Sequence, residues 1–340
     1  MILAIDLGTR NLHLVEGNAT GHGVEIRRAA VEPVTPGCLS DALIKDHVGL
    51  EVALRSALAK NGFKSSSVAI TVNSTHVFQK DLDVPPGKPK DVANMVRFEV
   101  LQSMGSGKDM VVEFVRTGET VNPEGTKLLR IRAAALLKDV ITDYHNVLRS
   151  VKLSPVAFDI HQNAISKLFK GATVNGRRMA GRSSILVDLG ATTTSVYILN
   201  DGEIVYNRLL PIGDQEIDRF LAQRRAAEEG AGRTAPEPDF TVDALRADAE
   251  LADAVRPYFN AVSDGITRII QYQKGRVDAF VAEDVLLFGG AAKYTGIDTT
   301  LANILGQSVE VISAVDRIKA PPKTRISDYI NAAGAMLRLE

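Results

Sequence analysis

One pattern of apolar and polar positions occurs twice in this chain. Each copy is an apolar run that ends in an aspartate, followed closely by a glycine, a hydroxyl side chain and a second apolar, β-branched run. The first copy covers residues 2–9 and carries Asp6, and the second covers residues 184–192 and carries Asp188. Apolar runs on both sides of a glycine predict a strand, a tight turn and a returning strand. The repeat therefore predicts a chain of two related halves.

The first half continues with alternating strand and helix patterns. They predict a strand at 23–31, an amphipathic helix at 41–60 that ends before Gly62, and a buried strand at 68–72. After Pro85-Pro86-Gly87 the pattern predicts a helix, two strands and another helix, at 89–104, 110–116, 127–135 and 136–151. We expect a first domain at 1–182 with an inserted subdomain at about 79–151. The mixture of strands and helices indicates the α/β class.

The second half contains a longer helical region. A helical stretch at 241–274 is expected to bend or break near Pro257, because proline lacks a backbone donor. A buried strand at 284–288 then runs into Gly289-Gly290. We expect a second domain at 183–340 with a helical lobe at about 213–275.

Composition sets limits on compartment and partners. The 340 residues suit two domains, and 45% hydrophobic and 24% charged residues with a net charge of −1 give no basic surface for nucleic acid. The single cysteine, Cys38, cannot form an internal disulfide, which indicates a reducing compartment. The sequence shows neither the features of a signal peptide nor an uninterrupted apolar run of about 18 residues. We expect a cytoplasmic protein that reaches a membrane only through a partner.

The repeated turn suits phosphate and metal chemistry. Glycine lets backbone N–H groups approach an anion, and an aspartate can hold hydrated Mg²⁺. One such turn alone is as often an ordinary β-hairpin, so the second copy is what favours binding. Gly289-Gly290 would also aim backbone N–H groups at a ligand near the carboxyl end of a strand.

Taken together, these motifs resemble the actin-like ATPase superfamily. Within it the chain is similar to the PilM family, the FtsA-like assembly proteins of type IV pili, over nearly its whole length. Four shorter segments look like PilM sequence in order and spacing: Val96-Arg97-Phe98-Glu99, Ala157-Phe158-Asp159, Leu210-Pro211-Ile212-Gly213, and Gly289-Gly290-Ala291 with Gly296. The resemblance implies an actin-like fold of two related domains around a nucleotide cleft.

The resemblance also implies the site residues. ATP would bind between the domains, with Asp6 and Asp188 holding Mg²⁺ through water. By position, the nucleotide-binding residues would be Asp6, Gly8, Thr9 and Arg10 in the first turn, His13 beside it, Asp188, Gly190, Ala191 and Thr192 in the second turn, and Gly289 and Gly290 on the adenosine side.

Two positions depart from the superfamily pattern. His13 stands where a lysine usually reaches the phosphates, so we expect weaker phosphate binding unless bound phosphate favours the charged imidazole or Arg10 turns toward it. His161 and Gln162 stand where many relatives place an acidic residue near the attacking water. Gln162 is a candidate catalytic residue that orients water, or a polar residue that caps its helix. We expect nucleotide binding with slow or no hydrolysis.

The resemblance implies a binding partner. The family binds the cytoplasmic N-terminal peptide of the bitopic membrane protein PilN in a groove that involves the inserted subdomain. The chain would then be an ATP-binding scaffold at the inner face of the cytoplasmic membrane. A pilus ATPase and a second copy of the chain are further candidate partners.

Two other functions remain open at this stage. One is a small-molecule kinase on the same superfold, although no acidic residue stands in a recognisable substrate-base motif. The other is an FtsA-type division protein, which would need a basic amphipathic C-terminal membrane helix, and the residues up to Leu339-Glu340 contain none.

Overall fold

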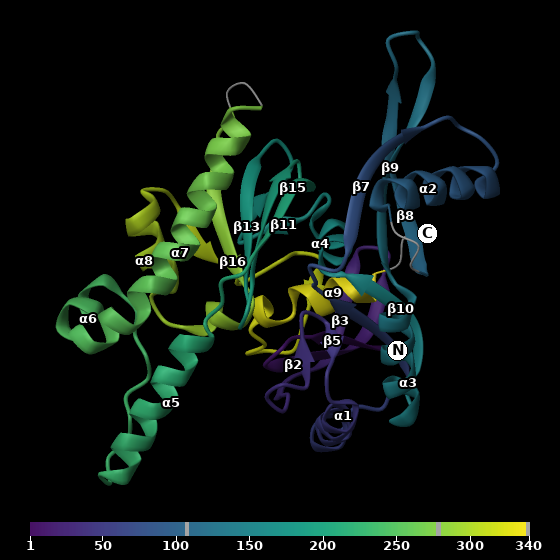
Figure 1. Ribbon diagram of the computed structural model, residues 1–340. Helices are drawn as coiled ribbons and strands as arrows, with labels where there is room; N and C mark the ends of the chain where they lie inside the picture. Colours follow the sequence, from purple (N-terminus) through teal and green to yellow (C-terminus); the bar gives the residue numbers. More distant parts are fainter. Residues whose placement is uncertain (106–108, 277–279, 338–340) are drawn as a thin grey trace.

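The computed structural model describes residues 1–105, 109–276 and 280–337. The expected ranges 79–151 and 183–340 also contain residues 106–108, 277–279 and 338–340, which lie outside the described residues. Figure 1 shows two α/β halves with helices α4 and α9 between them. This is the actin-like ATPase fold that the sequence predicted.

The first half is built on a sheet with strand order β10-β6-β1-β2-β3-β18. Its first three strands form an antiparallel meander, and β6 and β10 follow parallel to β1. The strand bounds are β1 (Ile2–Leu7), β2 (Asn11–Thr20), β3 (Gly23–Pro33), β6 (Ser67–Val72), β10 (Ser154–Ile160) and β18 (Ile318–Lys319). Strand β18 lies far along the chain, so the last part of the sequence returns to complete the first half.

The second half repeats this arrangement. Its strand order is β15-β14-β13-β16-β17, again a meander of three strands with two further strands parallel to the first. The strand bounds are β13 (Ser183–Leu189), β14 (Thr194–Asn200), β15 (Glu203–Leu210), β16 (Asp284–Phe288) and β17 (Val309–Val311). The duplicated sequence pattern thus marks a duplicated sheet.

Three cores hold the halves and join them. Alternation along β1 places Leu3, Ile5 and Leu7 against helices α1 (His47–Asn61) and α3 (Lys138–Ser150), while Ala4 faces the other way. The core on the Ala4 side also includes α4 (His161–Phe169), α9 (Ile330–Met336) and Leu186 of β13. The halves therefore share one apolar core. The outer face of the second sheet packs on the helical lobe.

The inserted segment has a separate core. Strands β7 (Phe78–Val84), β9 (Lys127–Leu137) and β8 (Met110–Val121) form a sheet in that order, covered by α2 (Pro89–Met104). Figure 1 shows this sheet projecting from the first half. Helix α3, expected within the insert, contributes its apolar side chains to the core of the first half and packs beside β10 and α1.

The predicted helix at 41–60 begins later than expected. Asp41 and Ala42 have φ angles of 49° and 56°, left-handed values incompatible with a helix, and form the turn between β4 (Leu39–Ser40) and β5 (Leu43–Ile44). The side chain of Asp46 accepts a hydrogen bond from the Gly49 backbone and caps α1.

The helical lobe contains α5 (Gln215–Gly230), α6 (Val242–Ala247) and α7 (Ala249–Lys274), and α8 (Ile297–Leu305) packs beside α7. The predicted stretch is not interrupted at Pro257, which lies inside α7. The break falls at Asp248, whose side chain accepts from Leu251 N and starts a new helix. Among the residues that the structure describes, none of the helices combines the length and apolar character needed to cross a bilayer.

Candidate functional site

The two Asp-Leu-Gly turns have the same backbone geometry. Gly8 N donates to Asn11 O, and Gly190 N donates to Thr193 O, both at 3.0 Å. A Cβ added at Gly8 would lie 2.8 Å from Asn11 O, and one at Gly190 would lie 2.7 Å from Thr193 O. Both distances are too short for a side chain, so each turn requires glycine.

The turns face each other across a cleft between the halves. A cavity of about 100 Å³ lies there. It brings together every residue that the sequence predicted to bind nucleotide: Asp6, Gly8, Thr9, Arg10, His13, Asp188, Gly190, Ala191, Thr192, Gly289 and Gly290. Pockets that bind small molecules and cofactors usually measure about 300–1,000 Å³. The cleft therefore has the predicted lining but is closed in this conformation.

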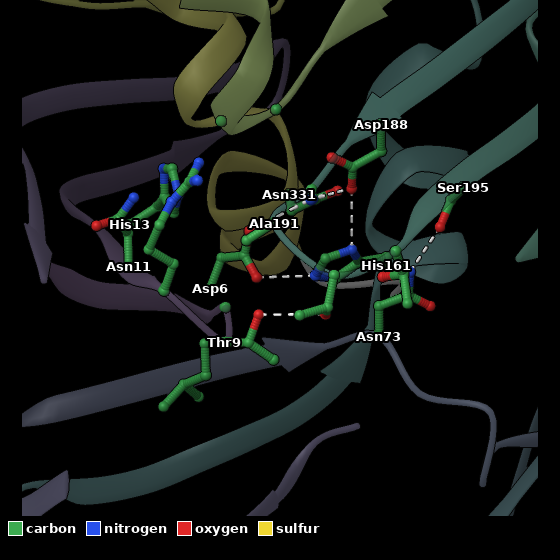
Figure 2. Close-up of a pocket in the computed structure, with 18 of the residues that line it drawn as sticks. Asp6, Thr9, Asn11, His13, Asn73, His161, Asp188, Ala191, Ser195 and Asn331 are labelled. Carbon is green, nitrogen blue, oxygen red and sulfur yellow. Dashed lines mark hydrogen bonds and ion pairs between the residues drawn. The ribbon is translucent and has the colours of Figure 1, made fainter. Parts of the chain in front are cut away.

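His161 lies between the two aspartates. It is the first residue of α4, and Figure 2 shows its ring between Asp6 and Asp188. Its Nε2 lies 2.8 Å from Asp6 Oδ1, and its Nδ1 forms an ion pair with Asp188 Oδ2 at 3.2 Å. All three side chains are buried. The imidazole thus joins the two halves at the centre of the site.

The ring is positively charged. Burial alone lowers the pKa of an imidazole, but the carboxylates of Asp6 and Asp188 outweigh burial and raise the pKa of His161 to about 10. The opposite holds for Asp6, where burial raises the pKa but His161 brings it below its usual value. At neutral pH both ring nitrogens therefore carry protons, and each nitrogen faces a carboxylate.

The space between the aspartates does not fit Mg²⁺. Mg²⁺ demands near-octahedral oxygen ligands at about 2.0–2.1 Å and usually keeps several waters. Here the carboxylate oxygens contact His161 and Asn331, whose Nδ2 lies 3.3 Å from Asp6 Oδ2 and 2.9 Å from Asp188 Oδ2. Within the described part of the chain, no cluster of three or more His, Cys, Asp or Glu side chains is arranged to hold a metal ion. The geometry does not support the expected Mg²⁺ between Asp6 and Asp188.

Three further contacts cross the cleft. Both guanidinium NH groups of Arg10 lie 2.9 Å from the carboxylate of Asp214, which is fully buried at the start of α5. The hydroxyl groups of Thr9 and Thr192 are 3.3 Å apart. Asn73 Nδ2 donates to Ser195 Oγ at 2.6 Å, as Figure 2 shows. In this conformation Arg10, one of the expected nucleotide-binding residues, pairs with Asp214 and joins the two halves.

His13 lies beside the first turn without a polar partner for one of its nitrogens. The β1–β2 register places it opposite Asp6, as Ser195 lies opposite Asp188 in the second half. Its side chain lines the cleft and is 9% exposed. Its Nδ1 is buried and has no hydrogen-bond partner among the described residues. This ring nitrogen is available to a ligand of the cleft.

Gln162 faces a different cavity. It is absent from the lining of the cleft and lines a groove of about 1,100 Å³ between the insert and the main sheet of the first half. The expected role of Gln162 in orienting water does not fit this placement. Neighbouring residues of a helix point in different directions, so His161 reaches the cleft while Gln162 reaches the groove.

The groove combines apolar and charged walls. Its lining includes Phe114 and Ala134 of the insert, Phe158 of β10, Gln162 of α4 and Ile204 of β15. The basic side chains that line it are Arg116, Arg132, Lys167, Lys170 and Arg317, and the acidic ones are Glu113, Asp159 and Glu203. Such a surface suits an extended peptide with both apolar and polar side chains.

The sequence did not single out several residues of the cleft. Asn73 follows β6 at the carboxyl end of a parallel strand, which is a general signal for a ligand site. Asp214 follows Leu210-Pro211-Ile212-Gly213. Its position at the start of a predicted helix, where acidic residues are favourable, could have drawn attention to it. Asn331 reaches the site only because α9 packs between the sheets, and no local pattern indicates this.

Comparison with solved structures supports the fold. A PilM-PilN type IV pilus biogenesis complex matches with a TM-score of 0.75 and 18% identity, covering 98% of this chain and 97% of that chain. The ethanolamine utilization protein EutJ from Carboxydothermus hydrogenoformans matches with a TM-score of 0.51 and 16% identity, covering 98% and 88%. MreB 5 of Spiroplasma citri bound to AMPPNP matches with a TM-score of 0.47 and 13% identity, covering 98% and 94%.

A family comparison covers almost the entire sequence. The family described as type IV pilus assembly protein PilM matches residues 4–337, which include both turns, the insert and α9. The chain therefore belongs to the family of type IV pilus assembly protein PilM.

Proposed function

We propose that this protein is a nucleotide-binding scaffold of type IV pilus assembly that holds the cytoplasmic N-terminal peptide of a PilN-like membrane protein in the groove beside its insert. The observation that carries the proposal is the family match together with a preformed groove of about 1,100 Å³. Through this partner the scaffold would work at the inner face of the cytoplasmic membrane. Family membership favours this function over the kinase and FtsA-type alternatives.

The groove supports peptide binding through its shape and its walls. The insert contributes apolar side chains such as Phe114 and Ala134, while α4 contributes the polar side chains of Gln162 and Asn163. Arg132 ties the insert to the second half, because it donates to Ile204 O at 3.0 Å and pairs with Asp81. A movement of one half relative to the other would therefore also move the wall of the groove.

The cleft supports nucleotide binding through its two turns. Their glycines permit close backbone approach, and the buried Nδ1 of His13 offers a polar contact. A cavity of about 100 Å³ must widen to hold a nucleotide, so Arg10 and Asp214 would have to separate or shift. A bound nucleotide would thereby change the position of one half relative to the other. Because Arg132 joins the insert to the second half, the shape of the groove would change as well.

Peptide binding can be tested with a wall variant. Ala134 is half-buried and lines the groove, so Ala134→Trp should fill it without removing a buried side chain. Fluorescence anisotropy with the N-terminal peptide of the PilN-like partner should show a loss of affinity of about 100-fold, roughly 2.7 kcal/mol. The matched control is Ala227→Trp on the exposed surface of α5, which should bind normally. Normal binding by Ala134→Trp would refute the groove assignment.

Nucleotide binding has its own test. At about 100 times its dissociation constant, ATP should stabilise the fold by roughly 2.7 kcal/mol and raise the melting temperature. Gly290→Leu should abolish this rise, because a Cβ there meets no atom nearer than Arg10 at 3.5 Å and the side chain would occupy the cleft with little strain. Absence of any rise with millimolar ATP, with or without Mg²⁺, would rule out the nucleotide site.

A further inference from the structure

We propose that His161 takes the place of a divalent cation between the paired aspartates, so that this cleft works without Mg²⁺ and becomes a divalent-cation site only when His161 is removed. The inference concerns the nucleotide site proposed above, but its main test needs no nucleotide. It starts from the disagreement between the expected Mg²⁺ and the groups that surround Asp6 and Asp188.

The His161 ring lies where a hydrated cation between the two aspartates would lie. A cation held through water by two carboxylates lies between them, about 4 Å from the carboxylate oxygens. That is where the His161 ring lies, 2.8 Å from Asp6 Oδ1 on one edge and 3.2 Å from Asp188 Oδ2 on the other. Ring and hydrated cation therefore require the same space.

Buried residues of α4 hold the His161 ring in this position. His161 begins α4, and its neighbours Ala164 and Ile165 are fully buried in the core that joins the halves. Asn331, 4% exposed on α9, donates to both aspartates from another side. Asp188 Oδ2 contacts both His161 and Asn331, so a cation that displaced His161 would also disturb the Asn331 contact with Asp188.

His161 also connects the two halves of the molecule. Asp6 belongs to the first sheet and Asp188 belongs to the second, and two buried carboxylates without a cation between them repel each other. His161 places one ring nitrogen against each carboxylate from within the chain. The halves are thus held across the cleft without metal, whereas a carboxylate or alanine at position 161 would leave the aspartates dependent on a cation.

The test compares Mn²⁺ and Mg²⁺ alone on the full chain and on His161→Ala. The wild-type melting temperature should be the same in EDTA and in millimolar Mn²⁺. His161→Ala should melt lower in EDTA and gain about 5 °C or more with saturating Mn²⁺. The gain should disappear when Asp188→Asn is added. His145→Ala, which removes an exposed histidine of α3, is the matched control and should show neither effect.

Two further measurements keep the inference falsifiable. If His161→Ala does not fold, His161→Ser keeps a small polar group but frees the space of the ring, and it should also gain Mn²⁺ binding, seen as one bound ion by electron paramagnetic resonance. A wild-type chain that binds one Mn²⁺, with loss of binding in Asp188→Asn, would overturn the inference. A folded His161→Ala without any Mn²⁺ response would overturn it as well.

A nucleotide arm separates this inference from the proposed function. Wild-type ATP affinity should be equal within about twofold in EDTA and in Mg²⁺, well below the tenfold change that corresponds to 1.4 kcal/mol. ATP binding that strictly requires Mg²⁺ would contradict the inference while leaving the nucleotide site intact. If ATP does not bind under either condition, the proposed nucleotide site is wrong, and the Mn²⁺ experiments still decide the role of His161.

Discussion

The cleft and the groove lie on the two sides of helix α4, and they differ in volume and in the contacts of their charged groups. The cleft has a volume of about 100 Å³, and its charged groups contact one another: Arg10 with Asp214, and His161 with two aspartates. The groove has a volume of about 1,100 Å³ and a mixed apolar and charged lining. A ligand of the cleft must replace internal contacts, whereas a ligand of the groove enters a space that already exists. We expect nucleotide binding to be coupled to conformation and peptide binding to be largely preformed.

Arg10→Ala tests the first side of this comparison and should have the largest effect on stability. It leaves the fully buried Asp214 without its bidentate partner, which should cost about 3 kcal/mol in the free energy of unfolding. Urea unfolding measures this loss. The control Asp218→Asn removes a half-exposed carboxylate 3.7 Å from Arg10 and should cost less than about 1 kcal/mol. Equal effects of the two variants would contradict a clamp at Asp214.

A buried carboxylate away from both regions provides a reference with a defined pH dependence. The carboxylate of Glu16 accepts from Lys64 N at 2.7 Å and Ser65 N at 2.6 Å, and these donors and Arg28 lower its pKa although burial raises it. A lowered folded-state pKa stabilises the protein above the unfolded value, near 4.5, and this stability is lost as pH falls through the folded pKa.

Glu16→Gln should therefore lower stability by about 2 kcal/mol at pH 7 and by much less at acid pH. Urea unfolding at several pH values between 3 and 7 measures the difference. A difference that does not shrink toward acid pH would show that the charge of Glu16 is not what stabilises this strand connection.

Asn73→Ala examines a weaker contact across the cleft. It removes one neutral hydrogen bond to Ser195, so stability should fall by about 1 kcal/mol. The double variant with Ser195→Ala should cost little more than Asn73→Ala alone, because both remove the same contact. Fully additive losses, measured by thermal unfolding, would mean that the two side chains do not act across the cleft.

Ala134→Trp should have the smallest effect on stability and tests the second side of the comparison. If the groove is preformed, the indole occupies existing space and the free energy of unfolding should change by less than about 0.5 kcal/mol. A large loss would indicate that the groove walls close on each other in solution. The same variant should still abolish tight peptide binding.

Much of the fold could be predicted from local sequence patterns. The two turns require glycine because of backbone contacts within four residues, so they could be recognised in the sequence and indicated both sheets. The residue-to-residue register, which puts His13 opposite Asp6, also follows from the hairpin alone. Helix bounds were less predictable where backbone conformation overrode the apolar pattern, as at Asp41 and Ala42.

The centre of the site depended on contacts between distant segments. His161 was noticed as a departure from a family pattern, but its position between the aspartates depends on how α4 packs between two sheets. Gln162 was assigned to the cleft because it stands where many relatives place an acidic residue near the attacking water. Successive side chains of a helix point in different directions, and Gln162 lines the groove instead. Asp214 and Asn331 lie far from the turns in sequence, so local patterns could not connect them to the site.

The return of the chain to its first sheet has a consequence for synthesis. Val24 N on β3 donates to Arg317 O, β18 pairs with β3, and α9 fills the core under β1 and β2. None of these partners exists while only the first half has left the ribosome. Until residues 317–336 emerge, one apolar face of the first sheet, including Ala4 and Val15, lacks its cover. Its folding therefore cannot be completed domain by domain, because a segment made after most of the second half covers the first sheet.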